Sequence, residues 1–420
     1  GEQAPLRDLE DHCVVGELAL DGRVRPVKGA LSIALEAKRC GRRRLLLPAE
    51  NAAEAAVVDG IEIFPIESLY QAWHFLAGNE TLASFKAKQP GVCNTRNEHE
   101  LDFVDVRGQQ YVKRALEVAV AGGHNLLMVG PPGTGKSMMA KRLPSIMPDM
   151  SEEEAIEATK IHSISGYLDP RRGLLTTRPF RTPHHTISSA GLLGGGSNPG
   201  PGEVSLAHRG ILFLDELPEF NRSTLEVMRQ PLEDGKVTIA RAAGSLTFPS
   251  DFMLVAAMNP CPCGYHGDPK RACRCSTRQI ERYRQRISGP LLDRIDLHVE
   301  VPLVDYRELS RAASGEDSAA IRTRVLASRQ RQAERFDEKV PRRTNSSLSA
   351  REVRTHCRLD EQSACLLEQA MDQLNFSARA YDRILKIART LTDLDAEEHI
   401  GTAQVLEAIQ YRSLDRTLVP

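Results

Sequence analysis

The 420-residue chain lacks any long apolar run. Its strongest apolar runs are Leu126–Val129, Ile211–Leu214 and Met253–Met258, whereas a membrane-spanning helix needs about 18–20 apolar residues. The first residues, Gly1–Pro5, resemble neither a secretory signal nor a lipidation site. We therefore expect a cytoplasmic protein that has no membrane partner.

The chain also lacks an excess of one charge and a dense array of cysteines. Its 55 Lys+Arg and 56 Asp+Glu give a net charge of -1, which excludes a uniformly basic protein but allows basic patches on one face. Nine cysteines are too few for a disulfide scaffold, and four of them lie within Cys261–Cys275, which indicates a local site in a reducing compartment. An ordinary hydrophobic fraction of 41% excludes global disorder.

The length and the residue pattern predict several domains. Residues 1–80 alternate short strand and helix patterns, which favours a small α/β lobe, and 81–99 has the composition of a linker. Residues 100–305 again alternate strands and helices and predict an α/β core. Residues 306–420 show helical spacing, including a capping box at Ser349 and Glu352, and predict a helical linker and bundle.

A phosphate-binding motif stands at the start of this core. The strand-like run Leu126–Val129 leads into the pattern G-x-x-x-x-G-K-S, whose glycines let backbone N–H groups surround a phosphate. We expect Lys136 to reach the β- and γ-phosphates of ATP and the Ser137 hydroxyl to bind Mg²⁺. The residues expected to bind the nucleotide are Gly130, Pro131, Pro132, Gly133, Thr134, Gly135, Lys136 and Ser137.

Two acidic residues at the end of a second apolar strand supply the rest of a hydrolytic site. Gly210–Leu214 leads directly into Asp215 and Glu216. We expect Asp215 to hold Mg²⁺, and Glu216 to polarise the attacking water as a general base. Together with the phosphate loop, the pair predicts hydrolysis of a nucleotide rather than binding alone.

Three further segments resemble those of AAA+ ATPases, namely Asp251–Asn259, Leu291–Asp296 and Ser377–Tyr381. The resemblance implies that Asn259, as sensor 1, helps to position the water. It implies that Arg294 is an arginine finger that acts on the ATP of a neighbouring subunit. It also implies that Arg379, as sensor 2, contacts the γ-phosphate from a C-terminal helical lid. Each arginine could instead form a surface salt bridge.

Longer motifs resemble the magnesium-chelatase-like branch of the AAA+ proteins and, within it, the ComM (YifB) family. These motifs are Arg178–Ser188, Gly191–Gly196 and Asn259–Gly264. The resemblance covers essentially the whole chain and implies a homohexameric, ATP-driven DNA helicase. Such a helicase moves branch points during homologous recombination, as in natural transformation. Two other functions stay open: a magnesium-chelatase motor subunit, and a regulatory ATPase that remodels a protein client.

The same branch carries two hairpin insertions, which correspond here to Gly191–Gly202 and Lys236–Phe248. The resemblance implies that both face the central pore of a ring. Lys236 and Arg241 could there contact the phosphates of single- or double-stranded DNA without reading its sequence. An ordinary solvated hairpin, with its bend at Ala243-Gly244, has the same pattern.

A cluster of cysteines offers a second candidate metal site. Thiolates at this spacing could bind Zn²⁺ and hold together a loop rich in Gly, Pro and Arg, or they could be reduced thiols or a redox-labile pair. His266 could replace one ligand. The adjacent His184 and His185 could bind a metal or take part in catalysis, but we favour a structural role for both. The candidate zinc ligands are Cys261, Cys263, Cys273 and Cys275.

The N-terminal lobe resembles the proteolytic domain of Lon, which has a ribosomal S5-like α/β fold, over Leu20–Leu31 and Arg44–Asn51. Because ComM proteins carry a longer lobe, we expect this one to be truncated at its beginning. The position of Lon's catalytic lysine is Ile33, which cannot deprotonate a serine, and Lys28 lies five residues early. We therefore predict no peptidase activity.

Two basic stretches could contact nucleic acid or neighbouring subunits, although each could equally be a solvated surface. One consists of Arg23, Arg25, Lys28 and Arg42–Arg44, and the other of Arg278, Arg282, Arg284 and Arg286.

Overall fold

The computed structural model describes residues 9–86, 101–169, 173–196, 200–241, 244–303, 315–336 and 343–414. Contacts divide the chain into two units. The N-terminal unit contains Gly1–Asn97 and Met150–Thr177, and the main unit contains Glu98–Asp149 and Arg178–Pro420. Most of the expected linker, 87–99, and the expected boundary near 305 lie outside the described residues.

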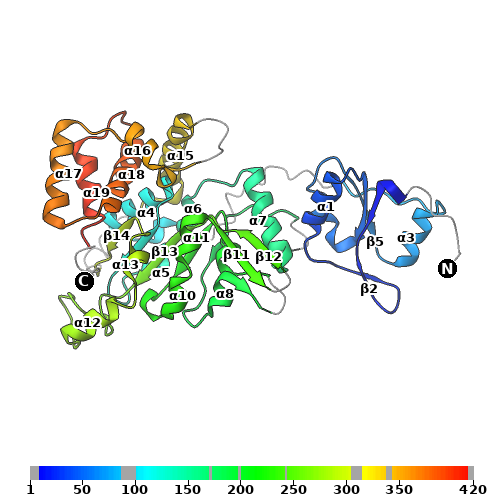
Figure 1. The fold of residues 1–420 in the computed structure, drawn as a ribbon, viewed down its shortest axis with the longest axis horizontal. Coiled ribbons are helices and arrows are strands. Elements are labelled where there is room, and N and C mark those ends of the chain that lie inside the picture. Colours follow the sequence, from blue (N-terminus) through cyan, green and yellow to red (C-terminus); the bar gives the residue numbers. More distant parts are fainter. Residues whose placement is uncertain are drawn as a thin grey trace. The chain divides into compact units, whose positions relative to one another are not determined.

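A parallel sheet of three strands in the order β1-β4-β5 forms the centre of the N-terminal unit (Figure 1). The sheet strands are β1 (His12–Val14), β4 (Arg44–Pro48) and β5 (Glu62–Ile66). The unit also contains a short hairpin of β2 (Glu17–Leu18) and β3 (Val24–Arg25). Its helices include α1 (Ala30–Arg39), α2 (Ala52–Ala55) and α3 (Leu69–Leu76). This is the small α/β lobe that the alternating pattern predicted.

Helix α7 (Glu152–Ser165) belongs to the N-terminal unit, although it lies far along the chain from the other elements of that unit. The buried carboxylate of Glu54 accepts a hydrogen bond from the backbone N–H of Leu31 in α1 (2.8 Å) and another from the hydroxyl of Ser163 in α7. The predicted core of 100–305 is therefore not one continuous unit. A helical pattern shows which face is apolar, but it does not show which neighbour covers that face.

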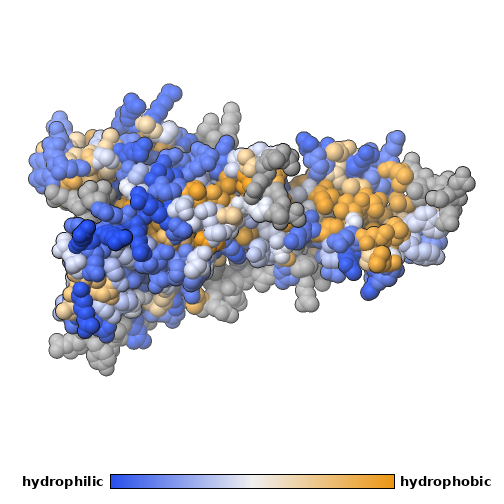
Figure 2. All heavy atoms as spheres, turned by 60° about the horizontal axis from the view of Figure 1, so that its bottom comes forward, coloured by the Kyte–Doolittle hydropathy of each residue, from blue (hydrophilic) through white to orange (hydrophobic). Residues whose placement is uncertain are grey.

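Large apolar side chains remain exposed on the N-terminal unit, where Figure 2 shows an extended hydrophobic surface. Leu20, at the turn between β2 and β3, is fully exposed. Val14, Leu18, Leu69 and Tyr70 of the same unit are also exposed. The core of this unit does not cover these side chains, and exposed apolar surface of this kind commonly marks an interface.

The main unit is built on a five-stranded parallel sheet in the order β14-β6-β13-β10-β7. Its strands are β6 (Leu126–Val129), β7 (Phe180–Arg181), β10 (Ile211–Leu214), β13 (Met253–Met258) and β14 (Leu297–Glu300). Every residue of β6, β10 and β13 is buried, which explains their uninterrupted apolar sequences. Because the strands are parallel, the loops that follow β6, β13 and β10 meet at one edge of the sheet.

Helices surround this sheet and form the C-terminal part (Figure 1). The helices that accompany the sheet strands along the chain are α4 (Gln110–Gly122), α5 (Lys136–Ala140), α6 (Leu143–Ile146), α8 (Ser189–Leu193), α9 (Glu203–Leu206), α10 (Arg222–Glu226), α11 (Arg229–Asp234), α12 (Thr277–Arg284) and α13 (Gly289–Leu292). The C-terminal helices are α15 (Ser318–Arg335), α16 (Ala350–His356), α17 (Glu361–Leu374), α18 (Ala378–Leu394) and α19 (Thr402–Gln410). Among the described residues, no helix combines the length and the apolar composition needed to cross a bilayer.

A buried ionic network joins the C-terminal helices. The carboxylate of Asp393 in α18 is fully buried, and Arg389 donates to it over 2.8 Å. Asn345 also donates to it over 2.8 Å, and Arg335 of α15 completes the network. A buried carboxylate needs such partners because its desolvation is costly. The network therefore fixes α15 against α18.

Candidate nucleotide-hydrolysis site

The loop between β6 and α5 has the backbone geometry that the G-x-x-x-x-G-K-S motif predicts. Gly133 and Gly135 lie in the left-handed region, at φ values of 82° and 88°, which residues with side chains rarely adopt. At Gly130 a Cβ atom would lie 2.3 Å from the carbonyl oxygen of Val301. The three glycines therefore allow the chain to turn closely above the sheet and begin a helix at Lys136.

The side chains of Lys136 and Ser137 point back into this loop. The Nζ of Lys136 donates to the carbonyl oxygens of Gly130 (2.6 Å) and Pro131 (2.9 Å), and it lies 3.4 Å from Oδ1 of Asn259. The hydroxyl of Ser137 donates to Asp215 over 2.5 Å. The chain thus brings together the amine, hydroxyl and carboxylate that the sequence assigned to the phosphates and Mg²⁺, and this donor set fits a Mg²⁺–nucleotide.

Burial lowers the pKa of the Lys136 amine. Desolvation lowers its pKa to about 8, although Asp215 and Glu216 act in the opposite direction. Bound phosphates would stabilise the ammonium form and raise this pKa.

We therefore expect nucleotide binding to take up roughly half a proton per site at pH 8, and almost none at pH 6.5, where the amine is already charged. Isothermal titration calorimetry in two buffers with different ionisation enthalpies measures this uptake. The Lys136→Arg variant is the control, because its guanidinium stays charged at both pH values. Equal proton uptake by this variant, or no uptake by the wild type at pH 8, would contradict the assignment to Lys136.

Glu216 stands beside Asp215, with its side chain 55% exposed. Its backbone lies in the left-handed region at a φ of 53°, and its N–H donates to Asp215 Oδ1 over 2.9 Å. Strained non-glycine residues of this kind are concentrated at functional sites. The geometry leaves the Glu216 carboxylate facing solvent, where a water molecule can approach it.

The structure places His185 next to this carboxylate, with its Nδ1 atom 3.5 Å from Oε2 of Glu216. Its ring packs against that of His184 at a centroid distance of 4.1 Å. The sequence interpretation gave both histidines a structural role and did not connect either with Glu216. The two histidines follow β7, the strand that pairs with β10, and this pairing brings them near Glu216.

Asn259 follows β13, the strand between β6 and β10. Its side-chain oxygen faces Lys136, and its backbone lies near the hydroxyl of the buried Tyr283 in α12. The strand order therefore puts Asn259 between the loop after β6 and the acidic pair after β10, where sensor 1 was expected.

Gln109 also contacts the site, and sequence reasoning missed it. Its Nε2 atom donates to the carbonyl oxygens of Thr134 (3.0 Å) and Pro302 (2.9 Å). Its backbone is left-handed, at a φ of 54°. Gln109 thus links the phosphate loop to the segment that follows β14, and only the preceding Gly108 hinted at an unusual backbone here.

The two expected catalytic arginines both lie near α13, Arg294 just after its end and Arg379 in the first turn of α18. Arg294 pairs with Glu233 of α11 and donates to the carbonyl oxygen of Pro290 over 2.5 Å. Arg379 begins α18, is 68% exposed and lies 3.7 Å from Asp293. Neither contact tests the roles expected for these arginines, because both roles require a bound nucleotide.

A second ion pair binds the lid helix α18 to the core. Arg383 lies one turn after Arg379, and its Nη1 is 3.2 Å from Oδ1 of Asp296. Asp296 is almost enclosed, yet Arg383 and His124 hold the pKa of its carboxyl well below its usual range. The segment Leu291–Asp296 thus contacts α18 on both sides of Arg294.

The two predicted hairpins are present in the main unit. Strand β11 (Lys236–Arg241) pairs antiparallel with β12 (Gly244–Pro249), and β8 (Gly194–Gly195) pairs with β9 (Gly200–Pro201). The hairpins touch each other, because a Cβ atom at Gly194 would lie 2.9 Å from Cδ1 of Ile239. Lys236 is exposed at the base of its hairpin. The predicted bend at Ala243 and the side chain of Arg241 lie outside the described residues.

The remaining candidates lie on loops and on the N-terminal unit. The four cysteine Sγ atoms lie within 4.8 Å of one another, whereas the exposed His266 is not part of this group. In the N-terminal unit, Ile33 packs against the apolar core, so this position offers no amine. The basic residues Arg23, Arg25, Lys28 and Arg42–Arg44 are exposed on the same unit.

Comparison with known proteins identifies the family. The family model described as "Magnesium chelatase, subunit ChlI" matches residues 102–309, its C-terminal counterpart matches 315–412, and "Subunit ChlI of Mg-chelatase" matches 2–51. YifB of Escherichia coli (strain K12) is 42% identical over 420 residues, which are 100% of this chain and 80% of YifB. The chain belongs to the ComM/YifB family.

Two other known proteins are also similar to this chain. The competence protein ComM of Haemophilus influenzae is 42% identical over 421 residues, covering 99% of this chain and 81% of ComM. Lon protease 2 of Bacillus subtilis is 28% identical over 185 residues, covering 38% of this chain and 33% of Lon protease 2. The predicted fold class is confirmed: a magnesium-chelatase-like AAA+ core with a C-terminal helical part. Membership of this ATPase family also supports ATP hydrolysis with Mg²⁺.

Proposed function

We propose that this ComM/YifB family member is a hexameric, ATP-driven DNA helicase that promotes branch migration during homologous recombination. The observation that carries the proposal is the 42% identity to the competence protein ComM over 99% of the chain, which includes the hydrolytic site and both hairpins. Competence is the state in which cells take up DNA, so a relative named for it points to DNA as the substrate.

The hydrolytic step follows from the residues at the edge of the sheet. The N–H groups of Gly130–Ser137 and the amine of Lys136 bind the phosphates, and Ser137 and Asp215 hold the Mg²⁺ ion that neutralises phosphate charge. Glu216 accepts a proton from the attacking water, which Asn259 helps to orient. Arg379 contacts the γ-phosphate from α18 within the same chain.

Assembly into a ring brings an arginine of one subunit to the ATP site of its neighbour. Arg294 extends into the site of the neighbouring subunit once it leaves Glu233, and there it stabilises the charge of the transferring phosphoryl group. The hairpins of β8–β9 and β11–β12 face the pore of the ring, where Lys236 and Arg241 contact DNA phosphates. These contacts do not read sequence, as a motor that moves along DNA requires.

We expect forked and four-way DNA to stimulate ATP hydrolysis and to be unwound when ATP is present. Phosphate release is measured with and without each DNA, and strand separation is followed with fluorescently labelled substrates at a fixed salt concentration. The Glu216→Gln variant is the control, because it should bind the same DNA without unwinding it. If no DNA changes the rate of ATP hydrolysis, the proposal is wrong.

The family models named for magnesium chelatase favour a second candidate, a motor subunit that drives metal insertion through a partner. The Lon-like segments Leu20–Leu31 and Arg44–Asn51 argue against it, because a chelatase motor subunit is not expected to carry a Lon-like lobe. However, a family model named for the chelatase also matches residues 2–51. A regulatory ATPase that acts on a protein client is the third possibility. An ATPase insensitive to DNA would favour one of these two functions.

A further inference from the structure

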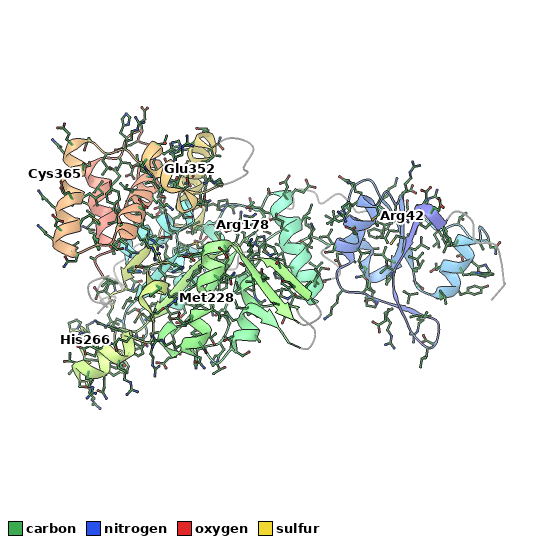
Figure 3. The ribbon with its side chains drawn as sticks, viewed as in Figure 1. Arg42, Arg178, Met228, His266, Glu352 and Cys365 are labelled. Atoms are coloured by element: carbon green, nitrogen blue, oxygen red, sulfur yellow. The ribbon has the colours of Figure 1, made fainter. Side chains whose placement is uncertain are left out.

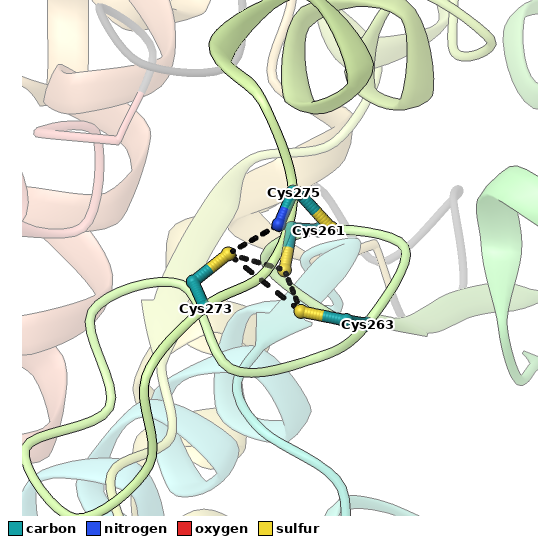
Figure 4. A group of neighbouring side chains, drawn as sticks. All are labelled: Cys261, Cys263, Cys273 and Cys275. Carbon is teal, nitrogen blue, oxygen red and sulfur yellow. Dashed lines mark hydrogen bonds between the residues drawn. The ribbon is translucent and has the colours of Figure 1, made fainter.

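The loop that joins β13 to α12 contains four thiols at the spacing of a metal site (Figure 4). The Sγ atom of Cys261 lies 3.4 Å from that of Cys263 and 3.7 Å from that of Cys273, and Cys263 and Cys273 are 3.6 Å apart. Cys275 completes the group, in which all four Sγ atoms lie within 4.8 Å of one another. Four sulfurs placed tetrahedrally around Zn²⁺ at 2.3 Å are separated by about 3.8 Å.

The surroundings of the thiols favour a cation rather than a disulfide. All four cysteines are free, and Cys261 is completely buried. The backbone N–H of Cys275 donates to the sulfur of Cys273 over 3.4 Å, a contact that stabilises a thiolate. A set made only of soft sulfur donors in tetrahedral spacing selects zinc over Mg²⁺ or Ca²⁺.

The loop has little else to hold it in place. No regular helix or strand lies between the end of β13 at Met258 and the start of α12 at Thr277. Its other internal contacts include short turns, such as the hydrogen bond from the N–H of Gly264 to the carbonyl oxygen of Cys261 (3.0 Å), and the side-chain contact of Arg271 with Tyr265 (2.8 Å). A loop of this length without secondary structure usually needs a functional or structural constraint. A metal ion bound by its four cysteines would provide that constraint.

This loop also touches the nucleotide site at two points. Gly264 packs against the phosphate loop so closely that a Cβ atom there would lie 2.7 Å from Cδ of Pro132. Asn259 lies two residues before Cys261, and its backbone lies near the hydroxyl of Tyr283 in α12. The cysteine loop therefore connects directly to Asn259 at one end, and Tyr283 lies just beyond its other end.

We propose that Cys261, Cys263, Cys273 and Cys275 bind one structural Zn²⁺ ion, which fixes Asn259 and the Pro132 side of the phosphate loop. The zinc site stands on the thiol geometry alone, whereas the effect on nucleotide binding rests on the proposed function. The metal ion takes no part in hydrolysis, and each cysteine is a positioning residue.

The zinc content of protein purified under reducing conditions without chelator tests the first part. Mass spectrometry of metals should find one zinc per chain, and the Cys273→Ser/Cys275→Ser double variant should lose it. Cys365→Ser is the matched control, because Cys365 is exposed on α17, away from the loop that carries His266 (Figure 3). Less than a tenth of an equivalent of zinc in the wild type, or iron in its place, overturns the proposal.

A second measurement avoids dependence on the folding of the variant. Zinc is removed from the wild type with a thiol-reactive mercurial and a chelator, thiols are restored, and circular dichroism confirms the helix content. Binding of a fluorescent ATP analogue should weaken by about tenfold or more and recover when zinc is added back. Unchanged affinity after zinc loss would overturn the positioning role. Zinc content is independent of DNA-stimulated ATPase activity, so failure of the proposed function would be recognised separately.

Discussion

A Glu216→Gln variant is expected to bind ATP as tightly as the wild type and to hydrolyse it about 10²–10⁴-fold more slowly. The amide keeps the size and polarity of the carboxylate but cannot accept the proton of the attacking water. Lys136, Ser137 and Asp215 are untouched, so the phosphates and Mg²⁺ should bind normally. Phosphate release and binding of a fluorescent ATP analogue separate the two steps, and the ring should accumulate in its ATP-bound state.

Glu219→Gln is the matched control for this experiment. Glu219 lies three residues later, is 42% exposed and pairs with Arg286 over 2.8 Å. Removal of its charge should change turnover by less than about twofold, as expected for an exposed ion pair. If Glu216→Gln hydrolyses ATP at the normal rate, a different residue must activate the water.

An Arg294→Ala variant is expected to lose about 10³-fold or more in turnover while it still binds ATP. In the proposed ring, its side chain stabilises phosphoryl charge in the neighbouring subunit. Arg322→Ala is the control, because Arg322 is similarly shielded (19% exposed), also pairs with one carboxylate, that of Asp149, and has no expected role in hydrolysis. Turnover is measured at saturating ATP for both variants.

Mixing variants distinguishes action between subunits from action within one chain. Lys136→Ala should be inactive because its own site cannot hold the phosphates, but it retains Arg294. In rings that mix it equally with Arg294→Ala, roughly a quarter of the head-to-tail interfaces combine an intact site with an intact arginine, so activity should return. Failure of mixed rings to recover any activity, after subunit exchange is shown by labelled chains, would contradict a trans role.

The sequence predicted the residues whose roles depend on short local patterns. The phosphate loop is local because its glycines, Lys136 and Ser137 are consecutive, and Asp215 could be found because it ends a buried strand. Even the contact between Ser137 and Asp215, 78 positions apart, follows from the convergence of parallel strands at one edge. The cysteine cluster was also visible, since its members lie within fifteen residues.

Contacts that depend on the direction of side chains could not be predicted from local sequence patterns. His185 reaches Glu216 because the loop after β7 passes beside the loop after β10, and no pattern in either segment encodes that approach. Arg383 in α18 pairs with Asp296, which lies just before β14 and 87 positions earlier in the chain. Gln109 depends on a left-handed backbone that glutamine seldom adopts. These contacts come from tertiary packing rather than local sequence.

The position of α7 also decides how this protein can be dissected. The chain passes between the two units three times, after Asn97, Asp149 and Thr177. A deletion that ends near Asn97 would remove the sheet of the N-terminal unit but leave α7 attached, so Ile156 would lose the apolar core on which it packs and Ser163 would lose Glu54. Such a truncated chain would expose part of α7, and its insolubility could be mistaken for a requirement of the lobe in catalysis. A clean separation would replace Met150–Thr177 with a short linker in the same experiment.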